Sequence, residues 1–227
     1  MPVACLLFWA ALARPAAASG APEQAVGAWL SLELEGNVYE KLVGGYFLTQ
    51  LRPIFYPPDD EQIILRGAAY LRVVDECTLW VGAEFDPSFV PELHQEYRIW
   101  EQFRVKNELL DSPKLVLWNR TRLEERFIEG ARGVALRLRH RVYADVEAEK
   151  GVHAVAYEEI FINLNTVQGG PKAGFDENRF FLGLGFDVDE HSRISVGYLD
   201  RYIAPDERRT SPSLQHFLEV DLNLWFY

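Results

Sequence analysis

The feature that most constrains the fold of this chain is an alternation of apolar with polar residues that recurs in one segment after another. It is clear in residues 30–35, 63–74, 79–85 and 193–198, and residues 218–226 repeat it near the end of the chain. Side chains of a β-strand point alternately to its two faces, so a period of two residues is typical of strands with one apolar and one polar face. The pattern therefore predicts an all-β protein.

The polar face of the three middle segments consists mostly of arginine and glutamate rather than serine, threonine or glycine. Within each segment these residues share one parity, and they alternate with apolar residues such as Leu136 and Leu138. The eleven residues are Glu96, Arg98, Gln102, Arg104, Arg120, Arg122, Glu124, Arg126, Arg137, Arg139 and Arg141. We predict that they form one charge network on a single face of the sheet.

Two folds produce such alternation, a soluble β-sandwich and a membrane β-barrel, and the charge density favours the barrel. The polar face of a sandwich meets open water, where several long rows of arginine are unusual. In an outer-membrane barrel the apolar parity faces lipid, and arginine and glutamate neutralise one another in the lumen. We therefore expect an antiparallel up-and-down transmembrane barrel of about 10 to 12 strands in the outer membrane of a Gram-negative bacterium. A soluble periplasmic β-sandwich binding protein is the alternative.

Turn residues divide the chain into about eleven segments, and longer breaks alternate with shorter ones as in outer-membrane barrels. The longer breaks lie at 56–62, 86–95, 166–177 and 204–214, and the shorter ones at 75–78, 110–113 and 189–192. Bacterial single-chain barrels have an even number of strands, so we expect one segment to be missed or counted twice. The error is expected within residues 29–55, where the turn lies at Gly36-Asn37 or at Gly44-Gly45.

The first 21 residues have the composition of a secretory signal peptide. Residues 3–13 form an apolar run that is too short to span a membrane, and small residues follow between Ala16 and Ala21. No lysine or arginine precedes the run, which departs from the usual pattern. We predict that residues 1–21 are removed on export and that residues 22–227 form a single barrel domain.

Composition argues against several partners and cofactors. The formal net charge is -11, which disfavours binding to nucleic acid. Cys5 lies in the predicted signal peptide and Cys77 is the other cysteine, so the mature chain has neither an internal disulfide nor a site with several thiolates. The acidic runs at 59–61 and 206–207 lack the ligand spacing of a calcium loop. We expect no metal and no cofactor.

Short motifs in the middle of the chain resemble a known family. They are Glu-Tyr-Arg-Ile-Trp-Glu-Gln at 96–102, Arg-Thr-Arg-Leu-Glu-Glu-Arg at 120–126, Arg-Leu-Arg-His-Arg at 137–141, and the segment 180–188 followed by Gly197-Tyr198. In this order and spacing they resemble the bacterial family catalogued as domain of unknown function 2490, from about Trp29 to the end of the chain. The resemblance implies an outer-membrane barrel of uncharacterised function, with no catalytic residues to assign.

The last segment resembles the C-terminal strand that barrel-assembly machinery recognises, which has apolar alternation and an aromatic terminus. Its apolar parity ends on Phe226, whereas Tyr227 falls on the face of Trp225, so the register differs by one residue. We expect the partners of the chain to be outer-membrane lipid and the assembly machinery.

The rows of arginine and glutamate are the main functional candidate, and they have two interpretations. They either fill a narrow lumen as a lattice of salt bridges or line a small pore that selects an anionic solute. We favour the structural interpretation because small barrels leave little open bore. A third class, a surface-adhesive barrel, depends on the outer loops.

The alternative function is that of an outer-membrane lipid-modifying enzyme, a hydrolase or acyltransferase with serine and histidine as nucleophile and base. His140 and His216 fall on the lipid-facing parity, but neither belongs to a His-x-Ser arrangement. The adjacent His191 and Ser192 lie in a predicted tight turn. We therefore assign no catalytic residue and expect that the protein is not an enzyme.

Two acidic residues do not fit the predicted division of the faces. Glu101 and Glu125 fall on the lipid-facing parity of their segments. An acid at the middle of a bilayer is costly, although less so than arginine or lysine. Either a bulge shifts the register at these positions, or they lie near a membrane interface.

Overall fold

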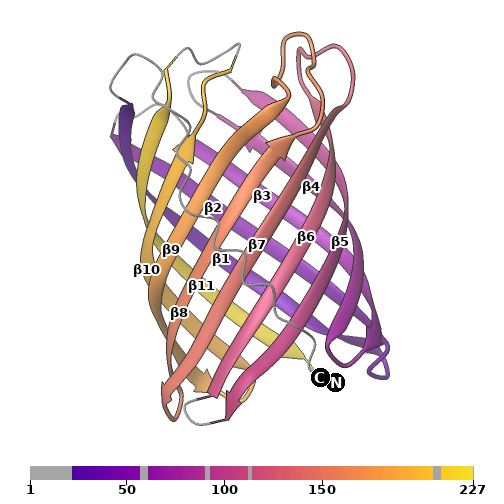
Figure 1. The fold of residues 1–227 in the computed structure, drawn as a ribbon, viewed down its shortest axis with the longest axis vertical. Coiled ribbons are helices and arrows are strands. Elements are labelled where there is room, and N and C mark those ends of the chain that lie inside the picture. The colour runs from indigo at the N-terminus through magenta and orange to yellow at the C-terminus, as the bar shows by residue number, and fades with distance from the viewer. Residues whose placement is uncertain (1–21, 57–60, 90–92, 112–113, 207–210, 227) are drawn as a thin grey trace.

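A computed structural model describes residues 22–56, 61–89, 93–111, 114–206 and 211–226, so the predicted signal peptide at residues 1–21 lies outside the described part. Eleven long strands curve into a barrel (Figure 1). They are β1 (Glu23–Tyr39), β2 (Val43–Tyr56), β3 (Glu61–Val74), β4 (Cys77–Ser88), β5 (His94–Asp111), β6 (Lys114–Ile128), β7 (Ala135–Glu149), β8 (Val152–Asn163), β9 (Gly174–Asp189), β10 (Ser192–Ile203) and β11 (Ser213–Phe226). The described residues contain no helix that is long and apolar enough to cross a membrane.

The sheet closes on itself, which confirms the predicted all-β barrel and makes the sandwich alternative wrong. Each strand pairs with its neighbours in the sequence in antiparallel fashion, while β1 pairs with β11 in parallel, from Glu23 beside Ser213 to Gly36 beside Phe226. The expectation of an even number of strands is wrong. With eleven strands in an up-and-down order, the first and last run in the same direction, so only a parallel pair can close the barrel.

Burial follows the alternation that the sequence shows. On β7, Ala135, Arg137 and Arg139 are buried inside the barrel, while Val142 on the other parity is 39% exposed. The pairing of β7 with β6 is continuous from Lys114 to Arg126 without a register shift, so one parity stays inside along the whole pair. The inner surface of the barrel wall is therefore polar and aromatic, and its outer surface is apolar.

The turn between β1 and β2 lies at residues 40–42, which corrects both positions that the sequence suggested. Gly36 is paired with Gly45 inside the strands, and Gly44 is paired with Tyr70 of β3. A Cβ atom on Gly44 would come within 1.9 Å of the Tyr70 ring. This glycine therefore makes room for a ring inside the barrel and does not form a turn.

The two ends of the barrel differ in their connections. Those that follow β2, β4, β6, β8 and β10 are longer than those that follow the odd-numbered strands, as the bounds of the strands show. We call these ends the long-loop end and the short-turn end, at the top and bottom of Figure 1. The alternation of loop lengths agrees with the sequence prediction.

The packed core of this molecule is the inside of the barrel. One cluster of buried side chains lies where β1 and β8–β11 face the lumen, and it contains Trp29, Val155, Tyr157, Phe181, Leu199 and Phe217. A second cluster is formed by Tyr70, Trp80 and Trp100 on β3–β5. Aromatic rings therefore fill two sides of the lumen, and the remaining space is left to charged side chains.

Candidate functional site

All the arginine and lysine residues of the described strands lie on the inner side of the barrel. They are buried, form ion pairs in the lumen or line its cavity. The set is Arg52, Arg66, Arg72, Arg98, Arg104, Lys106, Lys114, Arg120, Arg122, Arg126, Arg137, Arg139, Arg141, Arg179, Arg193 and Arg201. Burial of so many cations requires a matching set of carboxylates.

The first such carboxylate is Glu84 of β4, toward the long-loop end. It accepts hydrogen bonds from Arg66 (Nε to Oε2, 2.5 Å) and from Arg98. Arg98 also donates to Asp86 and Glu96, and Glu96 in turn accepts from Arg126 at 2.6 Å. A continuous chain of ion pairs thus joins β3, β4, β5 and β6 across the wall.

Two further carboxylates, Glu124 of β6 and Glu159 of β8, are each shared by several guanidinium groups. Glu124 binds Arg137 (2.6 Å) and Arg139 (2.5 Å), and its exposed fraction is 0%. Glu159, also 0% exposed, binds Arg139 (2.9 Å), Arg141 (2.7 Å) and Arg120 (2.6 Å). Arg139 therefore links the two carboxylates and joins the network on β6 to that on β8.

Aromatic rings support the guanidinium groups from the side. Arg122 lies 3.8 Å over the ring centroid of Trp100, and Arg139 lies 4.5 Å over that of Phe161. On the opposite side of the lumen, Arg52 lies 3.8 Å over Trp29. Such stacking favours arginine over lysine because the guanidinium group is planar and less strongly hydrated. These ion pairs and rings form a layer in the middle of the lumen that we call the plug, and its central residues are Glu84, Arg98, Glu124, Arg139 and Glu159.

A cavity of about 820 Å³ lies on the short-turn side of the plug. It reaches that end of the barrel, since Lys41 and Asp75 in two of the turns line it. Its lining includes Arg120 and Arg141 but neither Glu84 nor any of the residues paired with Glu84. The cavity is therefore a vestibule that ends at the plug.

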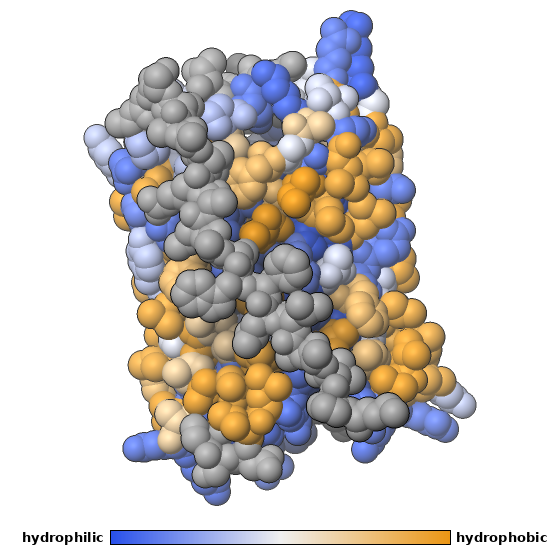
Figure 2. All heavy atoms as spheres, in the orientation of Figure 1, coloured by the Kyte–Doolittle hydropathy of each residue, from blue (hydrophilic) through white to orange (hydrophobic). Residues whose placement is uncertain are grey.

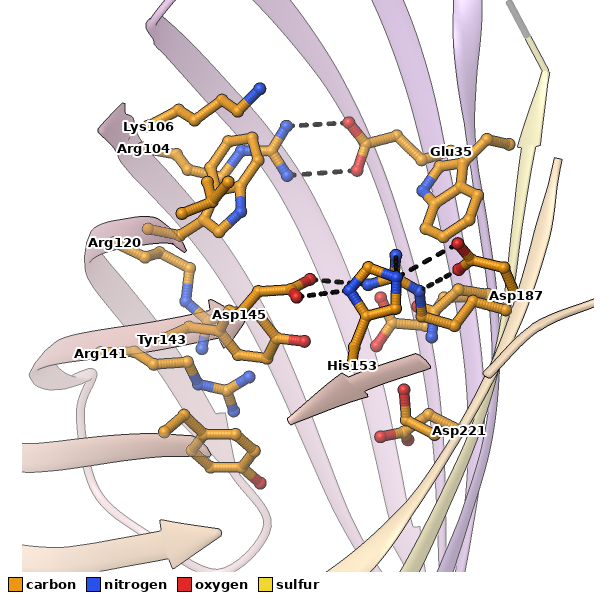
Figure 3. A pocket seen from close by; sticks show the side chains of 18 of the residues that line it. Glu35, Arg104, Lys106, Arg120, Arg141, Tyr143, Asp145, His153, Asp187 and Asp221 are labelled. Atoms are coloured by element: carbon orange, nitrogen blue, oxygen red, sulfur yellow. Dashed lines mark hydrogen bonds and ion pairs between the residues drawn. The ribbon is translucent and has the colours of Figure 1, made fainter. Parts of the chain in front are cut away.

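Two opposite arcs of the vestibule wall, β5–β6 on one side and β1 with β11 on the other, carry charges of opposite sign, whereas the wall between them carries both signs. Arg104, Lys106 and Arg120 stand on β5 and β6, whereas Glu35 and Asp221 stand on β1 and β11 (Figure 3). Arg104 donates two hydrogen bonds to Glu35 across the lumen, at 2.8 and 3.1 Å. The space between the arcs therefore lies between a basic and an acidic wall.

A smaller cluster stands near the short turns, around His153 of β8. Its Nδ1 atom lies 2.7 Å from Asp145, and its Nε2 atom lies 3.1 Å from Asp187. Arg193 donates to the same two carboxylates at 2.6 Å each (Figure 3). The cluster ties β7, β8, β9 and β10 together at the mouth of the vestibule.

The structure places all eleven residues of the predicted network on the inner face and divides them among several contacts. Arg98, Gln102, Arg122, Glu124, Arg137 and Arg139 are buried, and Glu96, Arg104, Arg120, Arg126 and Arg141 are partly buried. Arg122 donates to the neutral Gln102, at 2.7 and 2.9 Å. Arg104 pairs with Glu35 in the vestibule and lies outside the plug.

Sequence reasoning missed further members of the plug. They come from the flanking strands and are Arg66, Glu84, Asp86, Glu159, Asp176, Glu177, Arg179 and Arg201. The same inward parity marks Arg66, Glu84, Glu159 and Arg179 in the sequence. The signal was weaker there because the charges on the inward parity of these segments are interrupted by glycine and aromatic residues and form no long row of arginine.

The outer face carries a few polar residues among the apolar ones. His140 Nδ1 lies 3.0 Å from the hydroxyl of Thr121, and His216 lies 2.5 Å from the hydroxyl of Tyr198 and 3.0 Å from Gln24. Both histidines thus lie on the outward parity. The other histidines lie elsewhere: His191 is in a turn, and His94 is near a strand end.

Glu101 and Glu125 also lie on the outer face. The pairing of β5 with β6 shows no register shift between Glu96 and Glu108, so the proposed bulge is wrong. Glu125 lies three residues from the long-loop end of β6, whereas Glu101 lies deeper and is paired with Val81 and Leu123. Among the described residues, no group of three or more histidine, cysteine or acidic side chains is placed to hold a metal.

Comparisons with known proteins identify a family and give no named activity. Residues 26–211 match a family described as protein of unknown function DUF2490. An uncharacterised protein of Methylorubrum extorquens is 31% identical over 219 residues, which cover 93% of this chain and 92% of that protein. No solved structure matches the chain. The chain thus belongs to the DUF2490 family, as its arginine-rich motifs indicated.

Proposed function

We propose that this protein is an outer-membrane β-barrel whose lumen is closed by the plug, so that the arginine and glutamate network is structural and does not form an open pore. The observation that carries the proposal is the division of residues between the two faces. Each of the eleven strands presents at least one large hydrophobic side chain that is exposed on the outside, while the arginines and lysines of the strands lie inside.

The extent of the apolar outer surface supports a lipid environment. Hydrophobic side chains spread over the middle of the visible face in Figure 2, with hydrophilic ones concentrated at its two ends. Soluble monomers rarely expose contiguous apolar patches larger than a few hundred Å². Arginine or lysine on the lipid face of a barrel costs about 2–4 kcal/mol at the bilayer midplane. An outer face without these residues in its described strands therefore suits a bilayer.

Aromatic residues near the long-loop ends of the strands give a second argument. Outer-membrane barrels carry aromatic girdles where the wall meets the membrane interface. Here six such residues lie close to the long-loop ends of their strands, and Phe85 stacks on Tyr97 with ring centroids 4.8 Å apart. The six are Phe55, Phe85, Tyr97, Phe127, Phe175 and Tyr202.

The test combines location with conductance. The protein should fractionate with outer membranes and migrate differently on gels before and after heating, because a closed barrel satisfies its backbone hydrogen bonds and resists detergent. In planar bilayers the purified protein should show no steady conductance. Recovery in the soluble periplasmic fraction would contradict the location, and stable ion-selective channels would contradict the closed lumen.

Thiol labelling tests which face meets lipid. In a Cys77→Ser background, Arg141→Cys should react with a water-soluble maleimide through the vestibule that Arg141 lines. Val142→Cys, on the outward parity of the same strand, should react slowly in liposomes and faster after unfolding. Equal labelling of both positions in the folded protein would refute the assignment of faces.

A second candidate function, a lipid-modifying enzyme, rests on the pair formed by Thr121 and His140. A hydroxyl group within 3.0 Å of an imidazole on the outer face has the spacing of a nucleophile and its base. Hydrolysis of phospholipid in mixed micelles that is lost in both Thr121→Ala and His140→Ala would establish this function. Absence of turnover in the folded protein would leave the pair as a polar contact between β6 and β7.

A further inference from the structure

The acidic wall of the vestibule holds three carboxyl groups, Glu33, Glu219 and Asp221, whose hydrogen-bond partners are neutral hydroxyl groups or one another. Tyr46 donates to Glu33 at 3.1 Å, and Tyr157 donates to Glu219 at 2.8 Å. Within the described residues, neither these two nor Asp221 forms an ion pair with arginine or lysine, although Glu219 is only 5% exposed. Buried carboxylates normally have a cationic partner, because removal from water is costly. The vestibule thus has a place for a positive charge.

The opposite side of the vestibule, next to the plug, has more positive than negative charges, and we call this surface the floor of the vestibule. Arg120 and Arg141 both reach Glu159, which also binds Arg139, so three guanidinium groups share one carboxylate. Arg120 and Arg141 line the vestibule, and in Figure 3 they lie opposite Asp221. A guanidinium group has five N–H donors and can bind a second anion while it keeps one carboxylate. The floor therefore also has a place for a negative charge.

We propose that the vestibule binds a small zwitterion, with its ammonium group against Glu33, Glu219 and Asp221 and its anionic group against Arg120 and Arg141. The volume of about 820 Å³ lies within the range of about 300–1,000 Å³ that ligand pockets occupy. An amino acid or short peptide has this chemistry, and so does the phosphoethanolamine head of a lipid. The site lies inside the barrel wall, so the inference does not depend on the membrane location.

A zwitterion explains both walls better than a simple ion does. A cation alone would leave Arg120 and Arg141 sharing Glu159, and an anion alone would leave Glu33, Glu219 and Asp221 without a cation. Bound in one orientation, a zwitterion brings opposite charges to both arcs and needs no counterion. The bidentate pair of Arg104 with Glu35 also crosses the vestibule.

Tryptophan fluorescence of the full chain, folded in detergent micelles, measures the binding, because Trp118 and Trp225 line the vestibule. Triglycine should give a saturable change, and N-acetyl-triglycine and triglycinamide should bind at least tenfold more weakly, since each lacks one charge. Phosphoethanolamine serves as the second zwitterion. Tighter binding of phosphoethanolamine assigns the site to a lipid headgroup, and tighter binding of triglycine assigns it to a peptide. No saturable change with either zwitterion at millimolar concentration overturns the proposal, as does equal binding of the blocked forms.

Single substitutions test which charged group of the ligand each wall binds, and a folding check on each variant distinguishes loss of binding from unfolding. Asp221→Asn should weaken triglycine at least tenfold but leave N-acetyl-triglycine, which has no ammonium group, unchanged. Arg120→Gln should weaken both of these and leave triglycinamide unchanged. Glu125→Gln on the outer face is the control and should bind triglycine like the unaltered chain. Each variant is first checked for heat-modifiable migration, because unfolding would weaken all ligands alike. Equal weakening of all ligands in a folded variant would contradict the assigned orientation.

Discussion

Replacement of Glu124 by glutamine tests the plug most directly. The carboxylate is fully buried and accepts from Arg137 at 2.6 and 2.9 Å and from Arg139 at 2.5 Å. The change leaves Arg137 with Asp176 at 3.2 Å and Arg139 with Glu159 at 2.9 Å. The buried Arg122, which lies 3.7 Å from Glu124 and forms no other ion pair among the described residues, is left with the neutral Gln102. Breaking a buried pair by removal of one partner costs about 3–5 kcal/mol, because the other charge stays buried. We expect a loss of this size in the free energy of unfolding.

The reverse change, Arg139→Gln, should cost less. Glu124 keeps Arg137, and Glu159 keeps Arg120 and Arg141, so no carboxylate is left without a cation. The expected loss is about 1.5–3 kcal/mol, the range for hydrogen bonds to charged groups. The plug contains more arginines than carboxylates, and several arginines share one carboxylate. Removal of a carboxylate should therefore cost more than removal of an arginine.

The assay is the temperature at which the folded band converts to the unfolded band on gels, with urea unfolding in detergent as a second measurement. At roughly 2–4 °C per kcal/mol for a chain of this size, Glu124→Gln should lower the midpoint by roughly 6–20 °C. The neighbouring Glu125→Gln, on the outer face, is the matched control and should stay within about 0.5 kcal/mol. If the two variants unfold alike, or if Arg139→Gln is the more damaging change, the reasoning about shared carboxylates is refuted.

Two further predictions concern the strands themselves. Gly44→Ala should destabilise the barrel by about 1–3 kcal/mol, because the added Cβ would lie 1.9 Å from the ring of Tyr70, whereas Gly67→Ala, with nothing within 4 Å of its Cβ position, should be tolerated. Equal effects of the two in urea unfolding would contradict the packing. Phe226→Ser, at the exposed end of β11, should reduce the amount of barrel assembled in outer membranes but leave refolding in detergent unchanged, since the assembly machinery is expected to read this strand. Unchanged assembly in cells would remove that expectation.

The candidate site was only partly accessible from the sequence, for a reason that particular residues show. Parity along a strand is a local property, so the inward position of Arg98, Arg122 and Arg139 follows from the pattern alone. The partner of each arginine is set by register and by the width of the barrel. Arg104 and Glu35 are 69 residues apart, and no spacing rule brings them together.

The closure of the barrel is likewise a property of the whole chain. Each antiparallel pair joins strands that are neighbours in the sequence, and the turn signals mark most of them. The parallel contact between β1 and β11 depends on the strand count, which the sequence left uncertain around Gly36 and Gly44. Those glycines imitate turn signals, but Gly44 accommodates the ring of Tyr70, which comes from another strand.

The sequence by itself determined the strand class, the inner and outer parity and the chemistry of each face, because these depend on residues two positions apart. The tertiary structure decided which charges meet, where the plug ends and where the vestibule begins. Glu159 illustrates the difference: its inward position can be predicted from β8 alone, but its three arginine partners come from β6 and β7. Attraction between charges acts through space, and the closed sheet sets the distances over which it acts.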